Sequence, residues 1–296
     1  SFSLFQNGGL AVWFFFVLSG FLITYLLLSE IRRTHDVAVG KFLMRRVLRI
    51  WPLYFLIVVL GLAVVPFALQ MLGIEANTHL SIWAVGGYYL LFLSFVVNTL
   101  FHTGMLEPLW SIGVEEYFYV LWAPLFKFFK KNALAIIVSM IAVKTLMLVY
   151  LEFDTTMKAS LLGKIIAVLR FELMAIGGLG AYFTFYHRAR VERLWVFSPL
   201  AQYLLFGVLI VRIFFHWGLQ LSGNVLYAAV FKVPILGTYT EGVLFLWLIM
   251  NISVNPQPLF SFKNRVLDFL GEISYGIYMY QSLIIFVVIT LLKKPL

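Results

Sequence analysis

Long runs without a charged residue, separated by short polar turns, dominate the hydrophobic pattern of the chain. Five of these runs reach the roughly 20 residues that an apolar helix needs to cross a bilayer, and they lie at 1–29, 50–74, 76–106, 242–262 and 273–292. Their aromatic-rich segments lack the strict alternation of apolar and polar positions found in outer-membrane strands. The pattern therefore predicts an all-α fold, a polytopic transmembrane helical bundle.

About nine or ten membrane spans are expected from this pattern. Helical spans are predicted at 10–28, 51–72, 114–129, 133–151, 165–186, 199–216, 239–253 and 270–292, with weaker apolar stretches at 82–101 and 222–236. No soluble domain or low-complexity linker interrupts them, so we treat 1–296 as a single integral-membrane domain. Because Ser1 is not an initiator and no basic segment precedes the first apolar run, we expect the N-terminal part to be absent from this chain.

Basic residues indicate which turns of a membrane protein face the cytoplasm. They concentrate at 32–49, 127–131 and 188–193, whereas 73–87 and 102–113 contain no Lys or Arg and are predicted to be outward loops. Two consecutive outward loops exclude a full crossing between them. We therefore expect 82–101 to be re-entrant, entering the outer leaflet and returning while it lines a cavity.

Composition supports a membrane protein and excludes several other classes. Apolar residues make up 62% of the chain and charged residues 12%, whereas globular proteins have roughly 45–50% and about 25%. The net charge of +9 lies in short turns between apolar spans, which does not favour a nucleic-acid partner. Without cysteine the chain has no thiolate nucleophile, and its five histidines show no metal-ligand spacing, so no metal is expected.

Three arginines cluster before the second span. If their segment is helical, Arg45, Arg46 and Arg49 share one flank, because they are three or four residues apart. Such a cluster suits a polyphosphate ligand, since each guanidinium can grip phosphate oxygens with two donors. It also suits an interfacial anchor to anionic lipid. We expect Pro52 in the first turn of the following span, where its missing N–H is tolerated.

Two carboxylates open the predicted span at 114–129. Glu115 and Glu116 are adjacent, so on a helix they point about 100° apart and are not expected to act as a paired dyad. A helix N-terminus would stabilise at least one of them. The alternative is a functional role, because carboxylates inside a membrane are costly.

Other ionisable residues lie within or near predicted spans. Lys144 is in the middle of a span, so we expect it to face the bundle interior and pair with a carboxylate of another helix. Lys164 and Arg212 are near span ends, where long side chains reach the interface. The glycines at 177, 178 and 180 indicate close helix packing.

At several of these residues the chain resembles the membrane-bound acyltransferase 3 family. Four blocks carry the resemblance: Phe14–Thr24 (FFFVLSGFLIT), Phe42–Tyr54 with its arginines, Trp110–Tyr119 and Gly271–Tyr278. A looser match places Arg170 and Gly178 in a later helix of the family. These blocks follow one another in the family's order over nearly the whole chain.

The resemblance implies a membrane O-acyltransferase that moves an acyl group, usually acetyl, from cytoplasmic acyl-CoA to a hydroxyl of a surface or exported glycan. It implies that Arg45, Arg46 and Arg49 bind the phosphates of acyl-CoA. Glu115 would orient a catalytic histidine or the acceptor, and Arg170 would serve as an oxyanion or carboxylate partner. The acceptor-binding residues implied are Trp110, Glu116, Tyr117 and Tyr119. The implied partners are a glycan and membrane lipid, and the implied location is the bacterial inner membrane.

The chain departs from the family at three places. Family members begin with a helix that carries an Arg and a His thought to be catalytic, and this chain starts without it. Trp13 stands where many members have Asp, and Gln281 where many have His. A transporter or flippase for a lipid-linked or glycan substrate is the alternative from the residues alone, because buried charges also mark substrate pathways.

Overall fold

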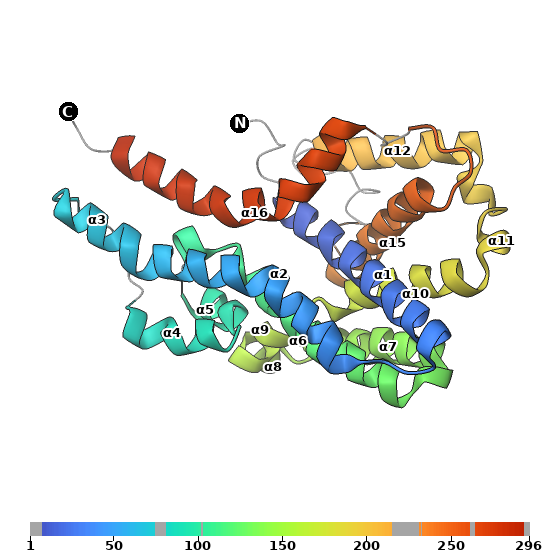
Figure 1. The fold of residues 1–296 in the computed structure, drawn as a ribbon, viewed down its shortest axis with the longest axis horizontal. Helices are drawn as coiled ribbons and strands as arrows, with labels where there is room; N and C mark the ends of the chain where they lie inside the picture. The colour runs from blue at the N-terminus through green and yellow to red at the C-terminus, as the bar shows by residue number, and fades with distance from the viewer. Residues whose placement is uncertain are drawn as a thin grey trace. The chain divides into compact units, whose positions relative to one another are not determined.

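The computed structural model describes residues 8–74, 81–101, 103–214, 231, 233–260 and 264–292, and every regular element in this part of the chain is helical (Figure 1). Six helical segments there are long and apolar enough to cross a membrane: Gly8–Thr34, Val39–Met71, Lys130–Phe153, Leu161–Tyr186, Pro234–Ser253 and Arg265–Leu292. The protein is therefore an all-α, multi-pass integral membrane protein, which confirms the predicted fold class. Two other predicted spans are also helical, over 114–128 and over 199–214, although neither helix is among the six.

The chain divides into two compact units. The first comprises 1–37, 124–158 and 170–262, and the second comprises 38–123, 159–169 and 263–296. The principal helices of the first unit are α1 (Gly8–Thr34), α7 (Ala133–Phe153), α10 (Phe171–Tyr186), α12 (Pro199–Phe214) and α15 (Pro234–Ser253). Shorter elements of this unit are η4 (Lys130–Asn132), α8 (Thr155–Ala159, whose last residue falls in the second unit), α11 (Arg188–Val191) and η5 (Trp195–Phe197).

Glycines bring α1 and α10 into direct backbone contact. A Cβ added at Gly177 would lie 1.9 Å from the Val17 carbonyl oxygen, and one added at Gly20 would lie 1.8 Å from the Met174 carbonyl oxygen. No larger residue fits at either position without moving a helix. The predicted packing role of the glycines around 177 is thus confirmed at Gly177 itself.

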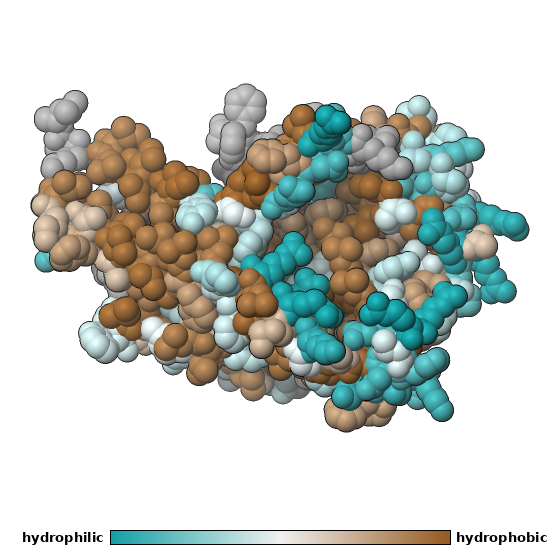
Figure 2. All heavy atoms as spheres, viewed as in Figure 1, coloured by the Kyte–Doolittle hydropathy of each residue, from teal (hydrophilic) through white to brown (hydrophobic). Residues whose placement is uncertain are grey.

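The basic turns of the first unit meet at one end of its helices. The Lys130 ammonium donates 2.8 Å to the His35 carbonyl oxygen and lies 3.3 Å from the Asp36 carboxylate. Donation from the Val37 backbone N–H, together with the Lys130 charge, lowers the pKa of Asp36. At the same end the Arg32 guanidinium lies 5.7 Å from the Phe185 ring centroid. Hydrophilic residues gather in Figure 2 over α11 and the C-terminal end of α1.

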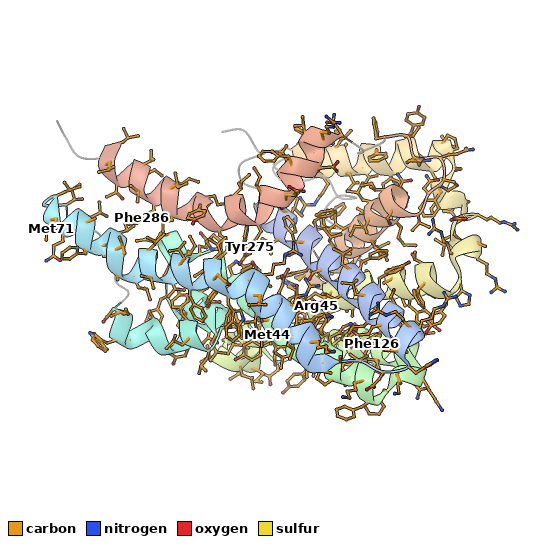
Figure 3. The ribbon with its side chains drawn as sticks, viewed as in Figure 1. Met44, Arg45, Met71, Phe126, Tyr275 and Phe286 are labelled. Carbon is orange, nitrogen blue, oxygen red and sulfur yellow. The ribbon has the colours of Figure 1, made fainter. Side chains whose placement is uncertain are left out.

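The second unit is built around a long helical segment, Val39–Met71. It consists of α2 (Val39–Val59), the π-helical turn η2 (Leu60–Val64) and α3 (Val65–Met71). The expectation that Pro52 begins a new span is wrong, because α2 continues through it. The other elements are α4 (Ile82–Leu90), α5 (Ser94–Leu100), η3 (Gly104–Leu106), α6 (Leu109–Phe128, whose residues from 124 onward fall in the first unit), α9 (Leu161–Val168) and α16 (Arg265–Leu292). Apolar side chains cover α3 and the C-terminal half of α16 in Figure 2, including the parts labelled Met71 and Phe286 in Figure 3.

The stretch at 82–101 is two short helices rather than one span. The helices α4 and α5 have 9 and 7 residues, and at about 1.5 Å per residue neither can cross a bilayer. Between them Phe92 has a φ of 57°, which is rare for a residue with a Cβ. The Tyr54 ring stacks on Phe92 with centroids 4.3 Å apart, and the Tyr54 hydroxyl donates to the Tyr89 carbonyl oxygen. A broken segment of this kind fits the re-entrant path, whose membrane side stays a prediction.

The helix that carries Glu115 begins at Leu109, not at 114. The Glu115 carboxylate therefore lies in the second turn of the helix, beyond the first turn, where the helix dipole is strongest. The N-terminal explanation of the carboxylates is therefore wrong. The weak apolar stretch predicted at 222–236 lies largely outside the described residues.

Candidate active site

The arginine cluster lies on α2, as its spacing predicted. Arg45 and Arg49 are exposed and Arg46 is half-buried (Arg45 is labelled in Figure 3). Across the described part of the chain, none of the three guanidiniums forms an ion pair with a carboxylate. Among the same described residues, the buried Nε of Arg46 also lacks a hydrogen-bond partner. This concentrated positive charge, with no carboxylate within ion-pair distance among the described residues, suits an anionic ligand.

Aromatic rings connect this cluster to the first carboxylate. The Arg46 guanidinium lies 5.6 Å from the Phe42 ring centroid and 5.7 Å from the Tyr119 ring centroid, within cation–π range. The Tyr119 hydroxyl in turn donates to Glu115 Oε2 at 2.9 Å. Arg46 and Arg49 both act electrostatically on the Glu115 carboxylate. The helices α2 and α6 thus bring together a cation, a tyrosine and a carboxylate that the sequence separates by about 70 residues.

Glu116 points in another direction, as the adjacent positions predicted. Its Oε2 accepts from the Trp51 indole N–H at 3.5 Å, and its buried Oε1 has no hydrogen-bond partner in the described structure. The Trp51 ring lies against Phe92 with centroids 5.1 Å apart. Glu115 and Glu116 therefore have different hydrogen-bond partners, as expected for adjacent positions on a helix.

The last helix adds two tyrosines to this unit. The Tyr275 hydroxyl donates to the Ile50 carbonyl oxygen at 3.1 Å, next to the arginine segment of α2 (Tyr275 is labelled in Figure 3). The Tyr278 hydroxyl lies 2.8 Å from Ser111 Oγ and donates to the Pro108 carbonyl oxygen at the start of α6. The roles of Ser111 and of both tyrosines were not predicted. The only sequence signal for them is that Ser111, Tyr275 and Tyr278 all lie in blocks that carry the family resemblance.

The remaining predicted acceptor residues lie on α6 but outside the Arg46 chain of contacts. Tyr117 is 39% exposed, donates to the Leu91 carbonyl oxygen at 3.2 Å and packs edge-on against Phe95. It therefore supports the break between α4 and α5. Trp110 is half-buried near the start of the helix. Between them, Gly113 leaves no room for a Cβ, which would lie 2.4 Å from the Phe92 carbonyl oxygen.

Arg170 belongs to the first unit, where its described neighbours also lie. It ends the break between α9 and α10, and its guanidinium lies 4.8 Å from the Trp13 ring centroid. Its Nη1 is 3.6 Å from Glu172 Oε1 and donates to Thr238 Oγ1 at 3.4 Å. The structure therefore places Arg170 in a different cluster from the residues of α2 and α6.

Two buried ion pairs complete that cluster. Lys144 Nζ lies 3.7 Å from Glu172 Oε2, which confirms the prediction that Lys144 pairs with a carboxylate of another helix. The expectation that Arg212 reaches the membrane interface is wrong, because its side chain is largely buried and donates through two nitrogens to Glu241 Oε1. The span-end rule failed because Glu241 of α15 offers a buried partner. Within the described ranges, no group of three or more His, Asp or Glu could hold a metal ion.

Fold and site together define a multi-pass membrane protein with an arginine cluster next to an aromatic and carboxylate site. A family model described as an acyltransferase domain (Acyl_transf_3) matches residues 1–295, so the chain belongs to this acyltransferase family.

Curated relatives cover parts of the chain. The peptidoglycan O-acetyltransferase OatA of Listeria monocytogenes is 32% identical over 127 residues, 41% of this chain and 20% of that protein. The O-acetyltransferase OatA of Staphylococcus aureus is 26% identical over 241 residues, 70% of this chain and 40% of that protein. The putative peptidoglycan O-acetyltransferase YrhL of Bacillus subtilis is 32% identical over 125 residues, 40% of this chain and 19% of that protein. The chain thus spans less than half the length of these relatives, and no solved structure matches it.

Proposed function

We propose that this protein is a membrane O-acyltransferase that transfers an acyl group, most simply acetyl, from cytoplasmic acyl-CoA to a hydroxyl of a cell-envelope glycan. The family match over residues 1–295 supports the acyl-transfer chemistry. The names of the relatives from Listeria monocytogenes and Bacillus subtilis support peptidoglycan as the acceptor class. All three relatives come from bacteria, which supports the bacterial plasma membrane as the location.

The observation that carries the proposal is the contact chain from Arg46 through Tyr119 to Glu115. It starts at a cationic cluster that has no carboxylate within ion-pair distance in the described structure, and it ends at a half-buried carboxylate. Acyl transfer from a nucleotide thioester needs both features: cations for the phosphates of the donor and a group that handles the proton of the acceptor hydroxyl.

The donor end of the site would lie on α2. Arg45 and Arg49 would hold the phosphates, because they are exposed and have no carboxylate within ion-pair distance in the described structure. Arg46 would contribute its Nε, which has no hydrogen-bond acceptor among the residues that the structure describes. These arginines belong to the basic segment at 32–49, which is predicted to face the cytoplasm, where acyl-CoA is found.

The acceptor end would use the residues of α6. In the reaction the hydroxyl oxygen attacks the thioester carbonyl carbon, the C–S bond breaks, the hydroxyl proton passes to a base and the departing thiolate takes up a proton. Glu115 would orient the base or the hydroxyl. Trp110, Tyr117 and Tyr119 would offer rings to the apolar faces of a sugar, and Glu116 would accept from its hydroxyls.

A transport assay run beside an esterification assay tests the proposal. Full-length protein in proteoliposomes is given labelled acetyl-CoA on one side and a peptidoglycan fragment on the other. A new glycan ester that requires the protein supports acyl transfer. Movement of the glycan across the bilayer without a new ester would support a transporter, the alternative that the buried ion pairs of the first unit favour.

A further inference from the structure

The helix α16 is attached to the second unit near its middle. Every residue from 265 to 273 is exposed in the described structure, and the buried residues of the helix are Met279 and Leu283. The hydrogen bonds from α16 to other described elements come from Tyr275 and Tyr278. These two residues are three positions apart and therefore lie on the same side of the helix. They mark the place where α16 is held against α2 and α6.

Tyr278 anchors α16 to the start of α6. Its hydroxyl lies 2.8 Å from Ser111 Oγ and donates to the Pro108 carbonyl oxygen at 3.1 Å, and Ser111 Oγ donates to the same carbonyl oxygen at 3.1 Å. Each hydroxyl donates or accepts, so the link between the two helices persists whichever hydroxyl supplies the proton. Ser111 is buried, which limits competition from water. This anchor fixes the position from which Tyr275, almost one turn earlier, contacts α2.

Tyr275 contacts α2 at a turn that lacks a backbone hydrogen bond. Pro52 lies inside α2, and a proline has no N–H to donate to the carbonyl four residues earlier, which is that of Leu48. Helices bend most readily at such a position. The Tyr275 hydroxyl donates to the Ile50 carbonyl oxygen at 3.1 Å, within this weakened turn (Tyr275 is labelled in Figure 3). Because a carbonyl oxygen has two lone pairs, this bond adds to the hydrogen bonds of the helix itself.

Arg49 belongs to the same turn, directly before Ile50. Its side chain is exposed, and no ion pair among the described residues orients it. Its direction therefore depends on the backbone that carries it. The charges of Arg49 and Glu115 both act on the Tyr275 hydroxyl, so the three groups are neighbours within the second unit. A change in the weakened turn would move the Arg49 guanidinium away from this arrangement.

We propose that Tyr275 is a positioning residue for the donor site: by bracing the turn of α2 that Pro52 weakens, it holds Arg49 in the direction that receives a phosphate of the acyl donor. Tyr278 and Ser111 supply the anchor for this brace. The inference rests on the proposed function, because it concerns the donor cations of the same site. It gives the last helix a part in donor binding that acts through the backbone of α2.

Equilibrium binding of labelled acetyl-CoA to full-length protein in nanodiscs tests the brace. Tyr275→Phe removes the hydroxyl and keeps the ring, so we expect acetyl-CoA to bind about 2-fold to 10-fold more weakly, the range of one neutral hydrogen bond. Tyr280→Phe is the matched control, because the Tyr280 hydroxyl is on the same helix and makes no hydrogen bond with the described residues. Arg190→Gln, at an exposed arginine of the first unit, is the charge control. Both controls should bind acetyl-CoA as the wild type does.

Two double variants separate positioning from a general structural role. If Tyr275 acts through Arg49, Tyr275→Phe should cause no further loss of binding in an Arg49→Ala background. A general loosening of the helices would instead add its loss to that of Arg49→Ala. Pro52→Ala returns the missing N–H to α2, so Tyr275→Phe should cost less there than in the wild-type background. Additive losses with Arg49→Ala, or an undiminished loss with Pro52→Ala, would overturn the inference.

A spin label follows the same turn without any ligand. The chain has no cysteine, so Leu48→Cys, at a position that is 69% exposed, provides a single labelling site on this turn. Mobility of the label should increase in Tyr275→Phe and stay as in the wild type in Tyr280→Phe. Unchanged mobility in Tyr275→Phe would overturn the inference.

The two measurements also keep this inference apart from the proposed function. If the wild type binds acetyl-CoA and Tyr275→Phe binds it equally well, the brace is rejected and the acyltransferase stands. If the wild type binds acetyl-CoA no better than Arg49→Ala does, the proposed donor site is rejected, and the mobility of the label at position 48 alone decides whether Tyr275 braces the turn.

Discussion

Replacing Tyr119 with phenylalanine removes one hydroxyl and leaves the ring in place. That hydroxyl donates to Glu115 Oε2 at 2.9 Å, while the ring lies 5.7 Å from the Arg46 guanidinium and 6.3 Å from the Phe42 ring. A hydrogen bond to a charged group contributes about 1.5–3 kcal/mol. If Glu115 works only when this bond orients it, Tyr119→Phe should lower kcat/KM for acyl transfer by about 10-fold to 100-fold.

The assay is a double-mutant cycle on acetyl transfer from labelled acetyl-CoA to a peptidoglycan fragment, with Tyr119→Phe, Glu115→Gln and the double variant. Because both residues act through one bond, the double variant should be hardly slower than the slower single variant. Tyr203→Phe, at an exposed position of α12, is the control and should leave the rate unchanged. Thermal unfolding of each variant checks that the helices remain packed. Wild-type activity in Tyr119→Phe, or strictly additive losses, would refute the reasoning.

Three other substitutions test the packing and the basic end. Gly177→Ala should destabilise the protein by about 1–3 kcal/mol, the usual cost of overpacking, because its Cβ would meet the Val17 carbonyl oxygen; an unchanged melting temperature would be inconsistent with that contact. Gly113→Ala should reduce acyl transfer more than it reduces stability, because the added Cβ would push the start of α6 away from Phe92; equal losses would argue against it. Because folding lowers the pKa of Asp36, the ionised carboxylate stabilises the folded state above about pH 3.8, the ordinary pKa of an aspartate side chain. This stabilisation is lost as the pH falls through the lower pKa of Asp36 in the folded protein. Asp36→Asn should therefore narrow the difference in melting temperature between pH 7 and pH 3, and an unchanged pH profile would contradict this.

Apolar periodicity predicted the spans well because a bilayer imposes a minimum helix length on each crossing. It also predicted that Lys144 needs an acidic partner, since a mid-span ammonium cannot reach water, and Glu172 supplies one. Charge-free loops indicated the unusual path of 82–101, and the structure breaks this stretch at Phe92. These features follow from local composition and from the cost of burying charge.

Contacts between distant helices could not be predicted in this way. Arg46 meets Tyr119 only because α2 and α6 pack together, and no pattern within either segment reports that packing. Arg212 is expected at the interface because it lies near a span end, and nothing in its own segment reports that Glu241, 29 residues away on another helix, is its partner. Pro52 looked like a helix start because sequence rules place proline in first turns, yet membrane helices tolerate it within their length.

The central claim is that the arginine cluster of α2 binds the phosphates of acyl-CoA. Equilibrium binding of labelled acetyl-CoA to full-length protein in nanodiscs tests it most directly, with Arg45→Ala and Arg49→Ala beside the control Arg190→Gln. The account predicts that each α2 variant weakens acetyl-CoA binding by about 10-fold or more, that added salt reduces the difference, and that the control binds as the wild type does. Wild-type affinity in both α2 variants would contradict it.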